Sequence, residues 1–298
     1  MTHMLVTGAA GLLGSEVVGA AEHRGYEVLA AGRDDLDVTD RDAVWDLLLG
    51  GRGARTDGLP APRFTDVVHC AAYTAVDGAE KEPAFAMRVN RDGTRHVAEA
   101  AAEAGARFVC VSTDYVFDGE ARAPYAPDAP VAPLSVYGRT KLEGERVALA
   151  SQPGALVVRT SWLYGAGGRN FVSAMLERGR EQSEPLRVVN DQRGRPSWAR
   201  NTAEGLLDLL ERRARGVWHV ADGGDATWLE LARQAFRMCG VPTPLEPVST
   251  EAWGAPAPRP RYSVLDVAGT EALLGRPQMD WHEALRRYLT EVGEIDAD

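Results

Sequence analysis

Two side chains near the middle of the chain have the types and the spacing of a proton donor and a neighbouring positive charge. Tyr137 and Lys141 lie four positions apart in residues 135–150, a stretch with helical periodicity, so they share one helix face. A free phenol, with a pKa of about 10, is a poor acid at neutral pH, but a nearby ammonium lowers that pKa. Lys141 can supply this charge and can also donate hydrogen bonds to a nucleotide ribose. Alone, the pair is typical of any exposed helix.

A third side chain, Thr113, follows the strand that we predict for residues 107–112. Ligands bind at the carboxyl ends of parallel strands, so this hydroxyl can hydrogen-bond a substrate carbonyl oxygen beside the phenol of Tyr137. A strand-end threonine is otherwise an ordinary turn residue. We interpret Thr113, Tyr137 and Lys141 as one catalytic set that acts on a carbonyl oxygen.

A glycine-rich turn closes the first predicted strand and opens the first predicted helix. Glycines allow the backbone to approach a pyrophosphate closely, and the N–H groups that begin the helix stabilise its charge. The turn spacing, GxxGxxG, resembles that of the extended short-chain dehydrogenase/reductase family. We expect a dinucleotide to contact Gly8, Ala10, Gly11, Leu12, Leu13 and Gly14.

Arg33 follows the second predicted strand, where dinucleotide-binding proteins recognise the adenosine ribose. A guanidinium can bind a 2′-phosphate through two hydrogen bonds, so Arg33 favours NADPH. A solvated surface arginine is the alternative, and NADH use stays open. Asp37 and Val38 follow in a segment that resembles the family's adenine-contacting turn, with a hydrogen-bonding role for Asp37 and a packing role for Val38.

Strands and helices alternate through the first half of the chain, which is typical of a doubly wound parallel sheet. Strands are predicted at residues 4–7, 27–31, 66–70, 107–112 and 155–160, and helices at 12–23, 40–49 and 87–104. Residues 50–63, rich in Gly, Arg and Pro, are expected to form a surface loop.

Longer helices after residue 160 indicate a smaller second lobe. They are predicted at residues 171–181, 202–214, 228–239 and 281–292, with strands at 186–189 and 217–220. We therefore expect an α/β fold in which residues 1–160 form a Rossmann-type doubly wound parallel sheet. Residues 161–298 would form mostly a smaller C-terminal α/β substrate lobe, with the strands near 186–190 and 216–221 returning to the first domain.

Composition limits the compartment and the class of partner. The 298 residues are 45% hydrophobic and carry a formal net charge of -10, from 43 acidic and 33 basic side chains. An excess of acidic side chains offers no basic surface that would bind nucleic acid or an anionic membrane. The three separated cysteines match no disulfide or metal pattern, and no apolar run approaches membrane-spanning length. We expect a cytoplasmic protein with free thiols and no signal peptide.

Over nearly its whole length the chain resembles the dTDP-4-dehydrorhamnose reductase family. The matching stretches are Gly8–Gly14, Ala71–Asp77 with Glu80, Glu82 and Pro83, Ser112–Gly119, Val136–Glu145, Arg159–Tyr164 and Asn190–Gly194. The resemblance implies cofactor contacts for Ala71, Ala72, Tyr73 and Asn90. It also implies catalytic roles for Thr113, Tyr137 and Lys141, and sugar contacts for Thr74, Val76, Tyr115 and Trp162.

The reaction implied by the resemblance is reduction of the C4 keto group of dTDP-4-dehydrorhamnose by NADPH, with Tyr137 giving a proton to the oxygen and no metal taking part. Arg259 and Arg261, in a proline-rich loop, are candidates for binding the substrate diphosphate, although the loop is equally explained as a solvated one. One alternative is a 4-ketoreductase for another dTDP-deoxysugar in natural-product glycosylation. Another is a catalytically silent regulatory subunit, which the intact catalytic set disfavours.

Two positions depart from the family pattern. Some family members dimerise around a magnesium ion bound by glutamates, and Glu16 and Glu291 match two of these. Arg200 stands where a third carboxylate is implied, and a cation there would repel the metal. We predict no bound magnesium and leave a homodimer possible. Trp198 replaces a small residue, and its bulk is expected to change the nearby lobe contact.

Overall fold

Six parallel strands form the central sheet of the computed structural model, which describes residues 3–50 and 64–296. They are β1 (His3–Thr7), β2 (Glu27–Ala31), β3 (Asp66–His69), β4 (Arg107–Thr113), β5 (Leu156–Thr160) and β10 (Gly216–His219). Their order is β10-β5-β4-β3-β1-β2, so the chain reverses its direction of winding between β1 and β3. Open α/β sheets bind ligands at this switch point. The predicted doubly wound sheet is confirmed, whereas the loop expected at 50–63 lies almost wholly outside the described residues.

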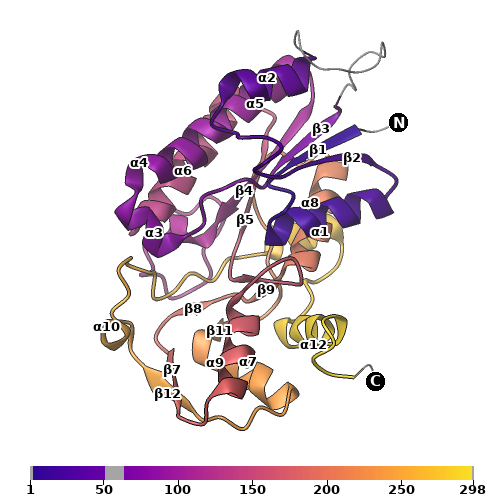
Figure 1. Ribbon diagram of the computed structural model, residues 1–298. Coiled ribbons are helices and arrows are strands. Elements are labelled where there is room, and N and C mark those ends of the chain that lie inside the picture. Colours follow the sequence, from indigo (N-terminus) through magenta and orange to yellow (C-terminus); the bar gives the residue numbers. More distant parts are fainter. Residues whose placement is uncertain (1–2, 51–63, 297–298) are drawn as a thin grey trace.

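Helices cover both faces of the sheet, because its strands are apolar on both sides (Figure 1). One face packs on α1 (Leu12–His23) and α8 (Ala199–Glu211), with Val6, Val17 and Leu206 buried between the layers. The other packs on α2 (Arg41–Leu49), α5 (Thr94–Glu103) and α6 (Val136–Ser151). The helix α6 that presents Tyr137 and Lys141 is therefore held rigidly against the sheet.

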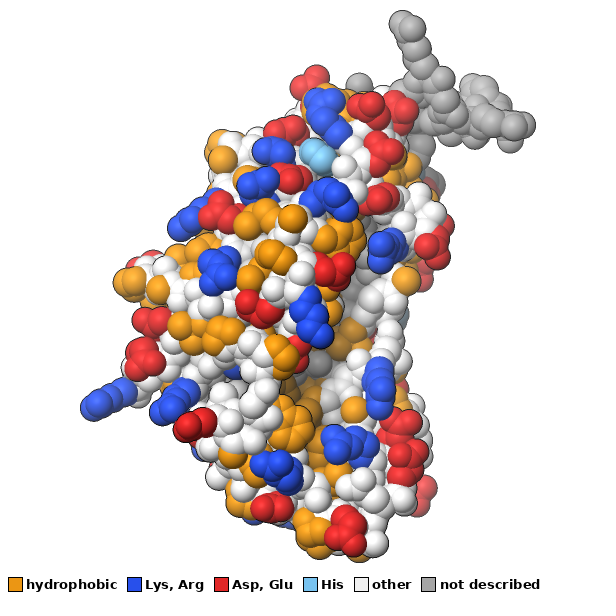
Figure 2. All heavy atoms as spheres, turned by 60° about the vertical axis from the view of Figure 1, so that its left-hand side comes forward, with side chains coloured by type: hydrophobic (Ala, Val, Ile, Leu, Met, Phe, Trp, Pro, Cys, Tyr) orange, Lys and Arg blue, Asp and Glu red, His pale blue; other side chains and the backbone are white. Residues whose placement is uncertain are grey.

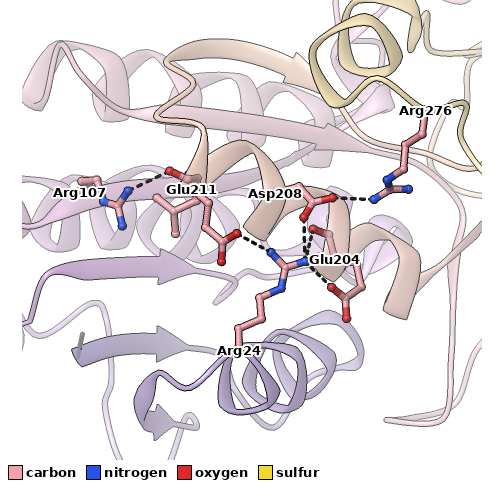
Figure 3. A network of polar contacts seen from close by, with 7 residues as sticks. Arg24, Arg107, Glu204, Asp208, Glu211 and Arg276 are labelled. Carbon is pink, nitrogen blue, oxygen red and sulfur yellow. Dashed lines mark hydrogen bonds and ion pairs between the residues drawn. The ribbon is translucent and has the colours of Figure 1, made fainter. Parts of the chain in front are cut away.

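Charged side chains join α1 to α8 (Figure 3). The guanidinium of Arg24, at the end of α1, contacts the carboxylates of Glu204, Asp208 at 2.9 Å and Glu211 at 3.2 Å, all on α8. Arg276 reaches Asp208 at 2.6 Å from the far side. Since α8 follows residues of the second lobe in the chain, these contacts anchor the returning chain on the Rossmann domain.

The second lobe lies below the carboxyl ends of the strands in Figure 1 and has its own apolar core, which includes Leu176, Leu229 and Leu285. Its elements are β6 (Leu163–Tyr164), α7 (Phe171–Glu181), β7 (Leu186–Val189), β8 (Arg193–Gly194), β9 (Ser197–Trp198), β11 (Ala226–Thr227), α9 (Trp228–Met238), β12 (Leu245–Val248), α10 (Thr250–Trp253) and α12 (Trp281–Glu291). A further helix, α11 (Ala268–Leu274), packs beside α8 and β10.

The two strands expected to return to the first domain behave differently. β10 pairs with β5 in the central sheet. The return expected for residues 186–190 is wrong, because β7 pairs with β12 in a separate two-stranded sheet. Leu186 and Val188 are buried in the core of the lobe, which keeps β7 there.

The connection between β3 and α5 contains more structure than the sequence indicated. It forms two short helices, α3 (Val76–Lys81) and α4 (Pro83–Met87), and then a π-helical turn, η1 (Arg88–Gly93), where a continuous helix over 87–104 was expected. A π-helical turn reorients the side chains within it, and such turns often occur at functional sites. A 3-10 turn, η2 (Asp114–Val116), similarly follows β4.

The surface carries both signs of charge. On the face shown in Figure 2, acidic and basic side chains are interspersed over the helical layer. Within the part of the chain that the structure describes, no helix combines the length and apolarity needed to cross a bilayer. Cys70, Cys110 and Cys239 are free thiols.

Candidate active site

A cavity of about 830 Å³ lies at the carboxyl ends of the strands and reaches the second lobe. It brings together segments that are far apart in the sequence. Its wall contains the predicted residues Gly8, Ala10, Gly11, Leu12, Leu13, Gly14, Arg33, Asp37, Val38, Ala71, Ala72, Tyr73, Thr74, Val76, Thr113, Tyr115, Tyr137, Lys141 and Trp162. The glycine turn and the Thr-Tyr-Lys set thus face one space.

The glycine turn has the shape of a pyrophosphate cradle. Gly8 has a φ of 67°, and a Cβ there would lie 2.5 Å from the backbone nitrogen of Ala71 at the end of β3. A Cβ on Gly14 would lie 2.2 Å from the oxygen of Gly8. No side chain caps the N-terminus of α1, so its first N–H groups can bind an anion. These features fit a dinucleotide.

The Thr-Tyr-Lys set converges from β4 and α6. Lys141 is buried, and its Nζ donates a hydrogen bond to the main-chain oxygen of Val111 at 2.7 Å. Ser135 caps α6 by accepting a hydrogen bond from the N–H of Gly138, which fixes the turn that carries Tyr137. The rings of Tyr115 and Tyr137 meet edge to face, with centroids 5.8 Å apart.

The phenol of Tyr137 is held in its protonated form. Burial raises its pKa to about 12, although a hydrogen bond with Thr113 acts to lower the pKa, and the charge of Asp114 raises it further. The pKa is therefore raised and not lowered as expected, because burial dominates, and the stabilisation of the phenolate by Lys141 stays a prediction. A protonated phenol is the form that a proton donor requires.

Asp114 is a buried carboxyl group beside Thr113 and Tyr137, and it had no assigned role in the sequence analysis. Burial raises its pKa to about 7, opposed by hydrogen bonds from Ser263 and Thr113. The Ser263 hydroxyl donates to one oxygen at 2.6 Å, and the Thr113 hydroxyl donates to the other at 3.1 Å. The sequence did offer a signal for Asp114, because it directly follows Thr113.

Two arginines lie around one aromatic ring in the cavity wall, near Asp37. The guanidinium carbon of Arg33 lies 6.0 Å from the ring centroid of Phe85, and that of Arg88 lies 5.0 Å from it. Hydrogen bonds from the backbone and hydroxyl of Thr39 lower the pKa of Asp37, and both arginines lower it further. Sequence reasoning missed Arg88, which lies three positions after Phe85 at the end of α4 and comes near Arg33 only through the tertiary fold.

Asn90 lies behind the cavity wall and does not line it. Its side-chain amide bonds both polar groups of the Tyr73 backbone, accepting at 2.8 Å and donating at 3.1 Å, and it also donates to the Thr140 hydroxyl at 2.9 Å. Asn90 therefore joins the wall segment to α6, and its expected contact with the cofactor stays a prediction.

Comparison with known proteins identifies the family. The family model described as the RmlD substrate binding domain matches residues 1–294. A "dTDP-4-dehydrorhamnose reductase" of Streptomyces griseus is 43% identical over 94% of this chain and 91% of its own length. The chain belongs to the RmlD family. It is an NAD(P)H-dependent oxidoreductase similar to dTDP-4-dehydrorhamnose reductases, as its resemblance implied.

Relatives within the RmlD family differ in their named substrates. A protein of Streptomyces antibioticus, named "Probable dTDP-4,6-dihydroxy-2-methyloxan-3-one 4-ketoreductase", is 41% identical over 97% of this chain and 95% of its own length. A dTDP-4-dehydrorhamnose reductase of Bacillus anthracis solved in complex with NADP has a TM-score of 0.90 and 34% identity, covering 98% of this chain and 100% of its own.

The proline-rich loop of this RmlD family member brings Arg259 against Tyr115, a residue of the cavity wall. Arg259 donates a hydrogen bond to the carboxylate of Asp77 at 3.0 Å, which ties the loop to α3, and the side chain of Arg261 is exposed. Neither arginine itself lines the cavity, and the expected diphosphate contact stays a prediction.

Arg200 fills the position where other RmlD family members are implied to place a metal-binding carboxylate. Its guanidinium donates to Glu16 at 3.2 Å and to Glu291 at 2.7 Å, and it lies 5.1 Å from the ring of Trp198. A covalently attached cation already lies between the two glutamates and contacts both, which does not fit a magnesium site. Homodimer formation stays a prediction.

Proposed function

We propose that the protein reduces the C4 keto group of dTDP-4-dehydro-6-deoxy-L-mannose (dTDP-4-dehydrorhamnose) to give dTDP-L-rhamnose, with NADPH as the reductant. The observation that carries this proposal is the single cavity shared by the glycine turn, the Thr-Tyr-Lys set and Trp162 of the lobe. The substrate follows from the names of relatives that are similar over nearly their whole length.

Each catalytic side chain has one task in this reaction. A bound reduced nicotinamide supplies hydride to the keto carbon. Tyr137 donates its phenolic proton to the keto oxygen, and Thr113 donates a hydrogen bond to the same oxygen as negative charge develops there. Lys141, whose ammonium is bonded to Val111 of β4, orients the nucleotide ribose. Its positive charge also stabilises the phenolate that remains after Tyr137 has given up its proton.

The preference for NADPH rests on Arg33 and Arg88. Both lie around Phe85 in the cavity wall, near Asp37. Two guanidinium groups can share a 2′-phosphate through charge-assisted hydrogen bonds, whereas a free 2′-hydroxyl offers them only a neutral acceptor. A structure of a relative with NADP supports this choice.

A second candidate is reduction of another dTDP-linked 4-keto sugar. It is favoured by the Streptomyces antibioticus relative, whose name specifies a different keto sugar at similar identity. The catalytic residues would keep the same roles, and the shape of the lobe side of the cavity would select the sugar.

The test is NADPH oxidation with enzymatically prepared dTDP-4-dehydrorhamnose, with other dTDP-4-keto sugars and NADH alongside. We expect turnover with dTDP-4-dehydrorhamnose and its loss in Tyr137→Phe, while Tyr26→Phe, outside the cavity, behaves as wild type. Turnover restricted to another sugar would select the second candidate. Tight NADPH binding without reduction of any keto sugar would favour the regulatory reading.

A further inference from the structure

Trp162, in the cavity wall, has a backbone conformation that its neighbours must hold in place. Its φ is 48°, in the left-handed region that an aromatic residue rarely adopts. A residue in such a conformation persists only where the surrounding structure determines it, and these residues concentrate at ligand-binding sites. The contacts that support Trp162 therefore bear on what the cavity recognises.

The first support is Trp228, at the start of α9. Its ring is stacked on that of Trp162, with centroids 3.6 Å apart and an angle of 3° between the planes. Thr227 and Glu230 form a reciprocal capping box, which fixes the first turn of this helix. The backbone of Trp228 is thus fixed by the start of the helix.

The second support is the hydrogen bond that orients the Trp228 ring. Its indole N–H donates to the Gln192 side-chain oxygen at 3.1 Å, and the Gln192 amide donates in turn to the Thr250 hydroxyl at 3.0 Å. Asp191 accepts hydrogen bonds from both the N–H and the hydroxyl of Thr250, at 2.8 and 2.6 Å. Gln192, the middle member of this chain of bonds, is only 4% exposed, so its amide is shielded from water.

The third support is Gly194 in β8. A Cβ at this position would lie 2.5 Å from two atoms of the Trp162 indole, so only glycine leaves room for the ring. Pairing of Gly194 with Ala226 in β11 holds the backbone there. The Asn190–Gly194 segment, which had no assigned role, therefore contacts both tryptophans.

We propose that Trp228 and Gln192 are positioning residues that hold the Trp162 indole as a fixed aromatic wall for the apolar face of the substrate sugar. This proposal rests on the proposed reduction of a nucleotide-linked keto sugar. Sugar rings stack their C–H faces on aromatic rings, and a fixed wall limits the orientations in which the keto carbon can enter the cavity. Loss of Trp228 or Gln192 should therefore raise the KM for the sugar and leave NADPH binding unchanged.

The test compares Trp228→Leu, which removes the stacked ring, with Gln192→Leu, which removes only the acceptor of the indole N–H. Trp253→Leu, on an exposed residue of α10, is the matched control. Each protein is assayed for the KM of the keto sugar and of NADPH, and fluorine NMR of fluorotryptophan-labelled protein reports the Trp162 ring. Trp162→Phe assigns that resonance.

We expect Trp228→Leu to raise the KM for the keto sugar about tenfold, Gln192→Leu to raise it about threefold, and Trp253→Leu to leave it unchanged. The KM for NADPH should be unchanged in all three, and the Trp162 resonance should shift and broaden in the first two. Trp228→Phe, which keeps an aromatic ring, should recover most of the loss. A Trp162 resonance and a keto-sugar KM that match wild type in both Trp228→Leu and Gln192→Leu would overturn the proposal.

Two readouts separate this inference from the proposed function. If the wild-type protein reduces no keto sugar, the proposed function fails and the assignment of the wall to a sugar fails with it. The Trp162 resonance still decides whether Trp228 and Gln192 hold the ring. If Trp228→Leu is too unstable to study, Gln192→Leu, with both rings present, carries the test.

Discussion

The ammonium group of Lys141 is bound to the main-chain oxygen of Val111, 2.7 Å away, two residues before the hydroxyl of Thr113. One contact therefore ties α6, which carries Tyr137, to the strand that presents the hydroxyl of Thr113. Tyr137 lies one turn before Lys141 on α6, so the lysine sets the separation between the phenol and Thr113.

Replacing Lys141 by methionine should abolish this link and the charge beside Tyr137. We expect kcat to fall by about 10²-fold or more, since the phenolate left by proton transfer loses its stabilising cation. Steady-state kinetics with the keto sugar measure the effect. Lys81→Met, on an exposed residue of α3, should retain wild-type kinetics. Equal kcat in the two variants would exclude a catalytic role for Lys141.

Asp114 should impose a pH dependence near neutrality. Its pKa is raised to about 7 by burial, so it changes charge within the working range. The ionised carboxylate opposes negative charge on the keto oxygen, so we expect kcat to decrease as the pH rises through about 7. Asp114→Asn should flatten the profile of kcat against pH in this region. Persistence of the same inflection in the variant would assign it to another group.

Arg33 and Arg88 should determine the choice of cofactor together. The double change Arg33→Ser and Arg88→Ser removes both guanidinium groups near the predicted 2′-phosphate position. We expect the KM for NADPH to rise about tenfold or more, with little change in the KM for NADH. Measuring both cofactors with each single variant shows whether the arginines share the phosphate. A parallel rise for NADH would instead indicate general damage to the adenosine site.

The buried ion pair between Glu145 and Arg159 should contribute to stability far more than an exposed pair on the same helix. Glu145 accepts hydrogen bonds from Arg159 at 2.8 and 2.7 Å, and both residues are almost fully buried. Glu145→Gln should lower the free energy of unfolding by about 3 kcal/mol, because it leaves a buried guanidinium unpaired. Glu143→Gln, which breaks the exposed pair with Arg146, should change it by less than about 0.5 kcal/mol. Urea unfolding of the two variants makes the comparison.

Arg200 should make the protein indifferent to magnesium. Its guanidinium already forms ion pairs with both Glu16 and Glu291, so we expect chelation with EDTA to change neither the oligomeric state nor the activity. Arg200→Glu would place three carboxylates together and should introduce magnesium binding, measurable by calorimetry. Magnesium binding by the wild-type protein at Glu16 would contradict this account.

The sequence alone determined the parts of this protein that depend on neighbours in the chain. Alternating apolar strands and amphipathic helices specified the doubly wound sheet, because each period reflects which face an element buries. The glycine turn followed from its place between β1 and α1. Thr113, Tyr137 and Lys141 could be proposed because strand ends and four-residue helix spacing have predictable geometry.

The tertiary structure decided what depends on contacts between distant segments. It brought together three pairs of residues that are distant in the chain: Arg88 with Arg33 around Phe85, Arg259 with Asp77, and Trp228 with Trp162. No local sequence pattern predicts that the two members of any of these pairs meet. It also placed β7 with β12, since a short apolar strand carries no signal for which partner it joins. The raised pKa of Tyr137 has the same origin: burial depends on the packing of the whole chain, whereas sequence spacing reveals only the nearest charge.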